Sequence, residues 1–366
     1  MRLMRYLLAS HNTLVVRGPA SVRVLSGEAA VLGAPLGKDE KLVIRREKQL
    51  PIEALSDLDL EIFSGGLGNV FEVEESTIPR SWKSAVEALA EMRQGIVTVI
   101  GGTDVGKSTL CTYAVNGLLS KGLTLRVIDA DIGQADIGPP GTVGSAVPSQ
   151  HVSSLVDLNP ESLIFIGDTS PSRVEAKLIS AIRRLVDLDS KHQSLTIINT
   201  DGWILDPEAV LYKIQLISAI LPDLVIGIGT STELQSILSV PKARSMIVEA
   251  PEKALPRSRS DRRAIRNAGY RRFLNGGAVQ TVPLDTVEVR KPTELPSLTT
   301  PLKDNLKNLL VGLLNEHGYL LRIGILMNAE HDFLKIFSRS VERSRIVELG
   351  YVKLSTDGTE LGYVDN

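Results

Sequence analysis

The residues with the clearest chemical role lie in the segment 101–109, Gly-Gly-Thr-Asp-Val-Gly-Lys-Ser-Thr, which fits the phosphate-binding pattern G-x-x-x-x-G-K-[ST]. Small residues let backbone N–H groups turn toward phosphate oxygens, and a helix after Lys107 adds the positive end of its dipole. Lys107 can reach the β- and γ-phosphates, and the Ser108 hydroxyl can bind Mg²⁺. A glycine turn without a ligand is the alternative, but a strand-like run at 96–100 and a helix-like run at 110–119 supply the context that the motif requires. The predicted nucleotide contacts in this loop are Gly101, Gly102, Thr103, Asp104, Val105, Gly106, Lys107, Ser108 and Thr109.

A pair of carboxylates, Asp129 and Asp131, closes the next expected strand. The two side chains point to the same side of an extended strand, because side chains alternate with a period of two. At this place one carboxylate can hold the Mg²⁺ shell, while another takes the proton from an attacking hydroxyl. A plain turn with exposed carboxylates is the alternative.

Three further side chains follow expected strands. Thr169 and Ser170, in Gly-Asp-Thr-Ser-Pro, can either donate hydrogen bonds to a substrate phosphate or cap the next helix. Trp203, in Asn-Thr-Asp-Gly-Trp, can either fill the core or stack on a nucleic-acid base. Its place beside a glycine in a loop favours stacking, which stabilises a bound base by ~1–3 kcal/mol.

The densest positive cluster of the chain runs from Arg257 to Arg272. If this segment is helical, Arg262 and Arg266 lie four residues apart on one face. Arginine side chains suit phosphate oxygens and the charge that develops during phosphoryl transfer. A solvated basic helix is the alternative, yet the concentration stands out in a chain whose net charge is only −2.

Strand and helix patterns alternate around these segments, which predicts a parallel sheet covered by helices on both faces. In such sheets the chemistry collects at the carboxyl ends of the strands. We expect strands at 96–101, 123–129, 162–167, 194–199, 223–229 and 245–249, and helices at 107–121, 172–190, 207–220 and 231–238.

The fold class is therefore α/β, with smaller domains on either side of the central sheet. Residues 1–80 read as a small β-rich N-terminal domain, and residues 81–280 as a phosphate-loop domain that includes a basic lid at 252–275. Residues 281–366 read as an α+β C-terminal domain. Its expected elements are a helix at 302–316 and strands near 319–327, 333–338, 346–355 and 360–364.

Composition limits the possible functions. The net charge of −2 predicts no general affinity for nucleic acid, so such a contact must come from a local basic cluster. The single cysteine, Cys111, cannot form an internal disulfide and suits a reducing cytoplasm. No apolar stretch approaches the ~20 residues needed to span a bilayer, so we expect no membrane contact.

Taken together, these segments resemble one family, the polynucleotide 5′-hydroxyl kinases. This family includes the kinase subunits of eukaryotic mRNA 3′-end formation, tRNA splicing and pre-rRNA processing, with archaeal relatives. The resemblance is carried by four ordered segments over about residues 96–275, and the flanking β-rich domains also fit the family layout. The segments are Thr103 to Thr109, Asp131-Ile132-Gly133-Gln134 with Pro140-Gly141, Thr200-Asp201-Gly202-Trp203, and Arg262 to Arg266. The family usually has proline where Gly102 stands, which should alter loop stiffness more than chemistry.

The resemblance implies a role for each matched residue. Lys107 neutralises the β,γ-phosphates, Asp131 deprotonates the 5′-hydroxyl, Trp203 stacks on a terminal nucleotide, and Lys48 falls where the family holds the purine. Arg257, Arg262, Arg263, Arg266 and Arg271 are all candidates for the lid charge, and Arg262 and Arg266 are taken as the catalytic pair. Substrate contacts are assigned to Gln134, Thr169, Ser170 and Trp203, and the metal to Ser108 and Asp129.

The sequence thus predicts an RNA 5′-hydroxyl kinase that uses ATP or another NTP with Mg²⁺, acting on single-stranded or duplex RNA, with DNA as a further acceptor. An NTP-driven switch or a scaffold subunit of an RNA-processing complex is the alternative. Related switch ATPases commonly carry an additional lysine early in the loop, where this chain has Gly102 and Thr103.

Overall fold

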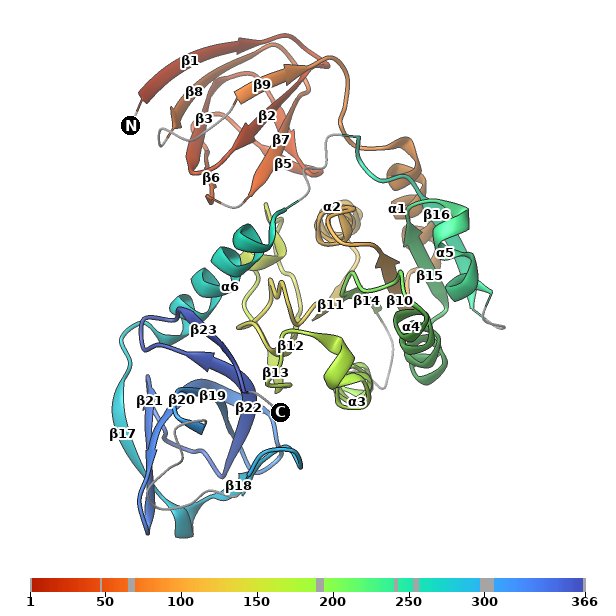
Figure 1. The fold of residues 1–366 in the computed structure, drawn as a ribbon. Helices are drawn as coiled ribbons and strands as arrows, with labels where there is room; N and C mark the ends of the chain where they lie inside the picture. Colours follow the sequence, from red (N-terminus) through yellow and green to blue (C-terminus); the bar gives the residue numbers. More distant parts are fainter. Residues whose placement is uncertain are drawn as a thin grey trace.

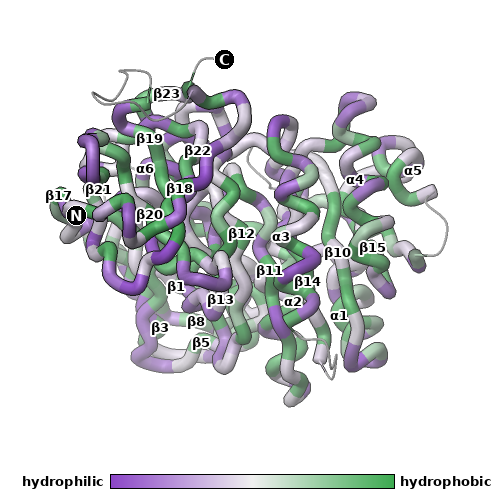
Figure 2. Tube along the Cα trace, turned by 90° about the horizontal axis from the view of Figure 1, so that it is seen from below, coloured by the Kyte–Doolittle hydropathy of each residue, from purple (hydrophilic) through white to green (hydrophobic). Residues whose placement is uncertain are grey.

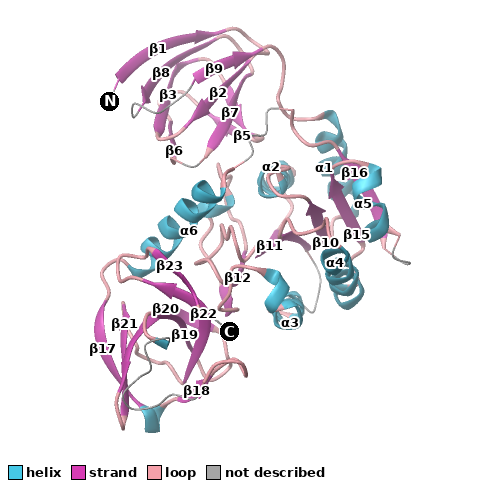
Figure 3. Cartoon of the chain, viewed as in Figure 1, coloured by secondary structure: helices cyan, strands magenta, loops and turns pink. Residues whose placement is uncertain are grey.

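Three bodies of secondary structure follow one another along the chain, and one long helix lies between the first and the last (Figure 1). The computed structural model describes residues 2–46, 48–64, 70–188, 194–239, 243–252, 257–296 and 306–364. In Figure 3 the first and last bodies are built mainly of strands, while most helices surround the middle one. This confirms the expected α/β centre with β-rich flanking domains.

The N-terminal domain is a sandwich of two antiparallel sheets, as the short alternating runs predicted. In β7 and β8 every second residue is buried, so each strand turns one face to the space between the sheets. One sheet has the order β1 (Arg2–Leu8), β8 (Leu58–Ser64), β3 (Ala20–Ser26), β6 (Lys41–Ile44). The other has the order β5 (Ala34–Leu36), β4 (Ala29–Val31), β7 (Gln49–Ala54), β2 (Thr13–Arg17), β9 (Val70–Val73).

The central sheet carries the phosphate-loop strand near its middle, and its strands β11, β14, β10, β15 and β16 are parallel. The predicted strands at 96–101, 123–129, 194–199, 223–229 and 245–249 are all found there. The sheet order is β13 (Ser162–Phe165), β12 (Thr142–Ala146), β11 (Leu125–Ala130), β14 (Leu195–Thr200), β10 (Gly95–Gly101), β15 (Leu224–Ile228), β16 (Arg244–Val248).

One edge of this sheet differs from the prediction, because β12 was not expected and pairs antiparallel with both β11 and β13. A parallel neighbour needs a crossover of a dozen or more residues, usually a helix, and the segment 131–141 contains none and includes Pro139-Pro140. Since β13 is antiparallel to β12, it runs in the same direction as β11. The residues after β13 therefore still lie at the carboxyl edge of the sheet.

Helices cover both faces of the sheet, which explains why its strands are largely hydrophobic throughout (Figure 2). Along β10, Val97 and Val99 pack with the residues of α1 and α2, whereas Ile100 packs with those of α4 and α5. The helices are α1 (Arg80–Met92), α2 (Lys107–Ser120), α3 (Glu175–Asp187), α4 (Pro207–Ile220) and α5 (Ser231–Leu238). Short 3-10 turns lie at η1 (Leu155–Asp157), η2 (Pro171–Arg173) and η3 (Leu284–Thr286).

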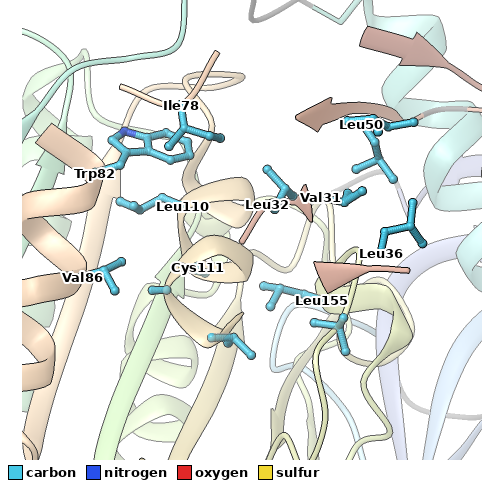
Figure 4. Close-up of a cluster of buried hydrophobic side chains, with 14 of the residues drawn as sticks. Val31, Leu32, Leu36, Leu50, Ile78, Trp82, Val86, Leu110, Cys111 and Leu155 are labelled. Atoms are coloured by element: carbon cyan, nitrogen blue, oxygen red, sulfur yellow. The ribbon is translucent and has the colours of Figure 1, made fainter. Parts of the chain in front are cut away.

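The N-terminal sandwich and the phosphate-loop domain share one hydrophobic core (Figure 4). Leu32 of the sandwich faces Leu110 of α2, and Leu36, Cys111 of α2 and Trp82 of α1 belong to the same cluster. All five side chains are buried. The helix that follows the phosphate loop is therefore packed on the N-terminal domain as well as on its own sheet.

The C-terminal domain is a further β-sheet, mostly antiparallel, that begins at Ala278, before the expected boundary at 281. The predicted helix at 302–316 is wrong for the described part: residues 301–305 lie outside the described residues, and Leu309–Leu314 form a fully buried strand. A short continuous apolar run fits a buried strand and a buried helix equally by periodicity. The sheet order is β17 (Ala278–Pro283), β21 (Phe333–Ser338), β20 (Leu320–Ala329), β19 (Leu309–Leu314), β22 (Ile346–Leu354), β18 (Glu288–Arg290), with β23 (Glu360–Tyr363) beside β22.

The basic segment forms a helix, α6 (Arg259–Leu274), that begins with a capping box between Ser258 and Asp261. Its last turns are apolar on one side, and Tyr270 and Leu274 are buried in a core cluster with residues of β19 and β20. The helix lies between the N-terminal and C-terminal domains (Figure 1). Within the described ranges, no helix has the length and apolar character to cross a membrane.

Candidate active site

The predicted site residues surround one cleft of about 1220 Å³ between the N-terminal domain, the carboxyl edge of the central sheet and α6. Four of them, Gly101, Gly102, Val105 and Asp129, do not line it. Those that do are Lys48, Thr103, Asp104, Gly106, Lys107, Ser108, Thr109, Asp131, Gln134, Thr169, Ser170, Trp203, Arg262 and Arg266. Residues that are distant in the sequence therefore meet in one space.

The phosphate loop joins β10 to α2 and has the backbone that its glycines predict. Gly101 has φ of 154° and Gly106, at the N-cap of α2, has φ of 98°, values that favour glycine. The Lys107 side chain is largely buried, and its ammonium donates to the Gly102 carbonyl at 2.6 Å. Burial lowers the pKa of Lys107, while the nearby Asp131 carboxylate opposes that shift.

Oxygen atoms suited to a divalent cation gather beside Ser108, which fits the predicted metal position. The Asn199 amide donates to the Ser108 hydroxyl at 3.2 Å and to Asp129 Oδ1 at 2.9 Å, while its own Oδ1 is buried and has no hydrogen-bond partner among the described residues. Mg²⁺ binds hard oxygen ligands of this kind and keeps several of its waters. The donor set therefore fits Mg²⁺, and Asn199 is a member that the sequence analysis missed.

Asp129 is fully buried and already well supplied with hydrogen bonds. Its Oδ2 accepts from the backbone N–H groups of Asp136 at 2.6 Å and Ile137 at 3.0 Å. Burial, with the charge of Asp136 second, raises the pKa of Asp129 to about 7. These hydrogen bonds hold the segment 131–137 at the cleft, and Asp129 itself does not line the cleft.

Asp131 follows β11 and faces the cleft. Its Oδ1 accepts the Gln134 N–H at 3.0 Å. Burial raises the pKa of Asp131, and the ammonium of Lys107 acts in the opposite direction. A carboxylate whose pKa lies nearer to neutral is a better proton acceptor at physiological pH, so Asp131 has the electrostatic setting of a general base.

Thr169 and Ser170 also line the cleft, in a turn shaped by Asp168. The Asp168 carboxylate accepts their backbone N–H groups at 2.6 and 3.0 Å. Ser170 stands at the N-cap of η2 but makes no side-chain cap bond, so the predicted capping role is not found. The Thr169 hydroxyl lies 2.6 Å from the Tyr363 hydroxyl of the C-terminal domain.

Trp203 lines the cleft with one ring face covered. It stacks on Tyr212 with the ring centroids 5.9 Å apart, and its indole N–H donates to Asp206 at 2.6 Å. The loop that carries it approaches the phosphate loop closely, because a Cβ on Gly202 would lie 2.7 Å from the backbone nitrogen of Thr103. The tryptophan is thus held half-buried next to the donor loop.

Below Trp203 lies a buried ion pair that the sequence analysis missed. The Lys213 ammonium is fully buried and lies 2.8 Å from Asp201 Oδ2, which also accepts the Tyr212 hydroxyl at 3.0 Å. Asp201 Oδ1 accepts the backbone N–H of Trp203 at 3.0 Å. A signal was present in the sequence, because Lys213 shares the apolar face of its helix with Leu216 and Ile220.

The N-terminal domain contributes Lys48 to the cleft, where its ammonium lies 2.9 Å from Asp136 Oδ1. This ion pair joins the N-terminal sandwich to the segment after β11. Apolar side chains of the sandwich and of α1, including Leu50 and Trp82, line the same cleft. The sequence analysis did not predict this apolar wall, because its members are single residues on separate strands and a helix.

The arginines of α6 are bound by carboxylates from two different domains. Arg262 lies 2.8 Å from Asp104 in the phosphate loop, and the backbone N–H of Arg257 donates to the same carboxylate at 2.9 Å. Burial opposes the charge on Asp104, but these two hydrogen bonds hold its pKa below the usual value. Arg266 instead forms an ion pair with Glu360 of β23 at 2.8 Å.

Comparison with known proteins agrees with this geometry. The model of the family described as mRNA cleavage and polyadenylation factor CLP1 P-loop matches residues 101–276, from the phosphate loop to just past α6. A polyribonucleotide 5′-hydroxyl-kinase of Pyrococcus furiosus is 28% identical over 341 residues, covering 79% of this chain and 96% of the relative. One of Methanocaldococcus jannaschii is 25% identical over 344 residues, covering 79% and 95%.

The solved structure of a wild-type Clp1p–Pcf11p complex has a TM-score of 0.77 with 13% identity, covering 96% of this chain and 98% of that chain. At this identity the likeness establishes a shared fold, across all three bodies. The family model covers the segments from the phosphate loop to α6, and the archaeal relatives match most of the chain. The chain is therefore similar over residues 101–276 to the CLP1-type P-loop family, and over most of its length to archaeal polyribonucleotide 5′-hydroxyl kinases.

Proposed function

We propose that the protein transfers the γ-phosphoryl group of ATP, or of another NTP, to the 5′-hydroxyl end of RNA, with DNA as a further acceptor. The observation that carries this proposal is the shared cleft, in which the phosphate loop, the carboxylate of Asp131 and the ring of Trp203 are exposed together. The archaeal relatives named polyribonucleotide 5′-hydroxyl kinases support the same activity.

On the donor side, the phosphate loop binds the triphosphate through its backbone N–H groups and the dipole of α2. Nucleotide binding would draw the Lys107 ammonium from the Gly102 carbonyl to the β- and γ-phosphate oxygens. Ser108 and Asp129, joined by Asn199, would hold Mg²⁺, directly or through water. When bound, Mg²⁺ neutralises charge on the β- and γ-phosphate oxygens.

On the acceptor side, Trp203 stacks on a terminal base, and the hydroxyls of Thr169 and Ser170 with the Gln134 amide contact the sugar-phosphate backbone. Asp131 accepts the proton of the 5′-hydroxyl as its oxygen attacks the γ-phosphorus in line with the leaving oxygen. Binding both ends in one cleft supplies orientation, which can lower the barrier of a two-substrate transfer by several kcal/mol, roughly 7–11 in well-oriented cases.

Lys48 and the apolar wall around it would hold the purine of the donor, while α6 covers the triphosphate with Arg262 and Arg266 on its inner side. Positive charge here stabilises the transferring phosphoryl group. A covered donor also keeps out water, which would otherwise compete as the acceptor.

The test is incubation of the purified protein with γ-labelled ATP, Mg²⁺ and an RNA that carries a 5′-hydroxyl, beside the same RNA with a 5′-phosphate. We expect label on the first RNA and none on the second. Hydrolysis of ATP that needs no RNA, with both RNAs unlabelled, would reject the proposal and favour an NTP-driven switch. Matched single-stranded, duplex and DNA acceptors would define the substrate, and the cytoplasmic location expected from the single cysteine stays a prediction.

A further inference from the structure

The lid helix α6 is held at two places by two carboxylates that belong to different domains. Near its N-terminus Arg262 is paired with Asp104 of the phosphate loop, and one turn later Arg266 is paired with Glu360 of the C-terminal domain. The two pairs differ in exposure, because the Arg262 side chain is 30% exposed and that of Arg266 17%. We therefore expect the more exposed Arg262 and the more buried Arg266 to have different roles in a reaction at the cleft.

Glu360 is built into a closed set of contacts. Its carboxylate is 3% exposed and accepts two parallel bonds from Arg266, at 3.1 Å from Nε to Oε1 and 2.8 Å from Nη2 to Oε2. Its backbone N–H donates to the Asn267 side chain at 2.9 Å, and its carbonyl accepts from Arg263. A forked arginine–carboxylate pair fixes orientation as well as distance, so Glu360 determines where this turn of α6 lies.

The same carboxylate also reaches the acceptor side of the cleft. The Tyr363 hydroxyl lies 3.2 Å from Glu360 Oε1 and 2.6 Å from the Thr169 hydroxyl. Thr169 lies in a turn that lines the same cleft as the phosphate loop. A chain of side-chain contacts thus runs from Arg266 through Glu360 and Tyr363 to Thr169.

Separating the Arg266–Glu360 pair would leave the buried carboxylate with the Tyr363 hydroxyl at 3.2 Å and the Arg263 guanidinium at 3.9 Å but without its forked ion pair, which is unfavourable. Arg262 is not held in this way, since Asp104 lies in the loop that binds the triphosphate, and phosphate oxygens are equivalent partners for its guanidinium. Arg262 can therefore exchange one anion for another at the donor site, whereas Arg266 remains with Glu360.

We propose that Glu360 is a positioning residue of the kinase site, through which the C-terminal domain fixes α6 over the donor. In this assignment Arg266 connects the helix to Glu360, and Arg262 is the arginine that contacts the transferring phosphoryl group. The inference rests on the proposed function and adds to it a role for a domain that lies outside the matched family model.

The test compares Glu360→Gln with Glu288→Gln, which alters an exposed ion pair of the same domain. A lid that is misplaced by about 1 Å should lower kcat by ~10–100-fold while leaving the KM for RNA nearly unchanged. The ratio of ATP hydrolysed to RNA phosphorylated should rise, because water gains access. A residue that only stabilised the fold would lower the unfolding temperature without changing that ratio. Glu288→Gln should behave as wild type.

A double-variant comparison separates the two arginine roles. If Arg266 acts through Glu360, the effects of the two substitutions should not add, because the partners act as a unit. Arg266→Gln, and the double variant that also carries Glu360→Gln, should then each have an activity within about threefold of that of Glu360→Gln alone. A loss in Arg266→Gln ~100-fold beyond that of Glu360→Gln would show direct contact with the phosphoryl group and overturn the assignment.

Two further outcomes keep this inference distinct from the proposed function. If the wild-type protein does not label RNA, the proposed function fails. If the wild type labels RNA and a folded Glu360→Gln variant matches it in kcat and product ratio, the inference about Glu360 fails. Should Glu360→Gln not fold, Asn267→Ala removes only the acceptor of the Glu360 N–H and should raise the hydrolysis ratio in the same direction; an unchanged ratio would reject the inference.

Discussion

The two walls of the cleft are built in different ways. The phosphate-binding part of the donor wall comes from one continuous segment, since the residues from Gly101 to Thr109 end one strand and begin one helix. The acceptor wall is assembled from separate segments, among them the Trp203 loop and the turn at Thr169, whose hydroxyl contacts Tyr363 of β23. The phosphate-binding residues of the donor wall are therefore determined by one stretch of sequence, whereas the positions of the acceptor-wall side chains depend on tertiary packing.

The sharpest way to test the donor wall is Lys107→Ala. Loss of a charge at the transferring phosphoryl group should lower the rate of transfer to RNA by ~10³-fold or more. Lys121→Ala at the other end of the same helix is the matched control, since Lys121 is exposed. End-labelling of RNA measures both, and substantial activity in Lys107→Ala would break the assignment of the donor wall.

Asp131→Asn tests the point at which the two walls meet. Removal of a general base should lower kcat by ~10²–10⁴-fold, with nucleotide binding retained. Because burial raises the pKa of Asp131 and only the carboxylate form accepts a proton, the wild-type rate should rise with pH through that pKa and then level off. The variant should lack this rise, and a pH profile identical in shape to the wild type would assign the base elsewhere.

Lys213→Met tests how the acceptor wall is supported. It leaves the buried Asp201 without its cation, which should lower the free energy of unfolding by ~3–5 kcal/mol, measured by denaturant titration. Since Lys213 lowers the pKa of Asp131 and Asp201 raises it, the rise of the rate should also move to higher pH. Lys83→Met, an exposed lysine of α1, should change stability by less than about 0.5 kcal/mol. Equal effects of the two changes would contradict the support role.

The smallest expected effect is that of Trp203→Ala, which tests whether this side chain contributes to RNA binding. Trp203→Ala should weaken RNA binding by ~1–3 kcal/mol through the loss of stacking, with the KM for ATP nearly unchanged. Trp203→Phe keeps a ring at the position and should recover most of the affinity. Fluorescence titration with RNA and with ATP measures the two substrates separately, and equal losses for both would indicate that the tryptophan serves the core.

The sequence predicted those features that depend on neighbouring residues. Strand, glycines and helix in succession are sufficient to place Lys107 and Ser108, and alternation of strands and helices predicts the central sheet. The partners of Lys213 and Glu360 could not be predicted in this way, because Asp201 and Arg266 lie on other elements; the helical pattern places Lys213 on an apolar face but does not identify its carboxylate. β12 was missed because its sequence, Thr-Val-Gly-Ser-Ala, is short and only weakly apolar.

Because the sandwich and α2 share one hydrophobic core, we expect them to unfold together. Leu32 and Leu36 on one side and Leu110 and Cys111 on the other belong to the same cluster, so neither half retains a complete interior when the other is removed. Calorimetry should then record the sandwich and the nucleotide-binding half melting as one cooperative unit. We expect a fragment that starts at α1 to expose a large hydrophobic surface and to aggregate rather than to remain an active kinase.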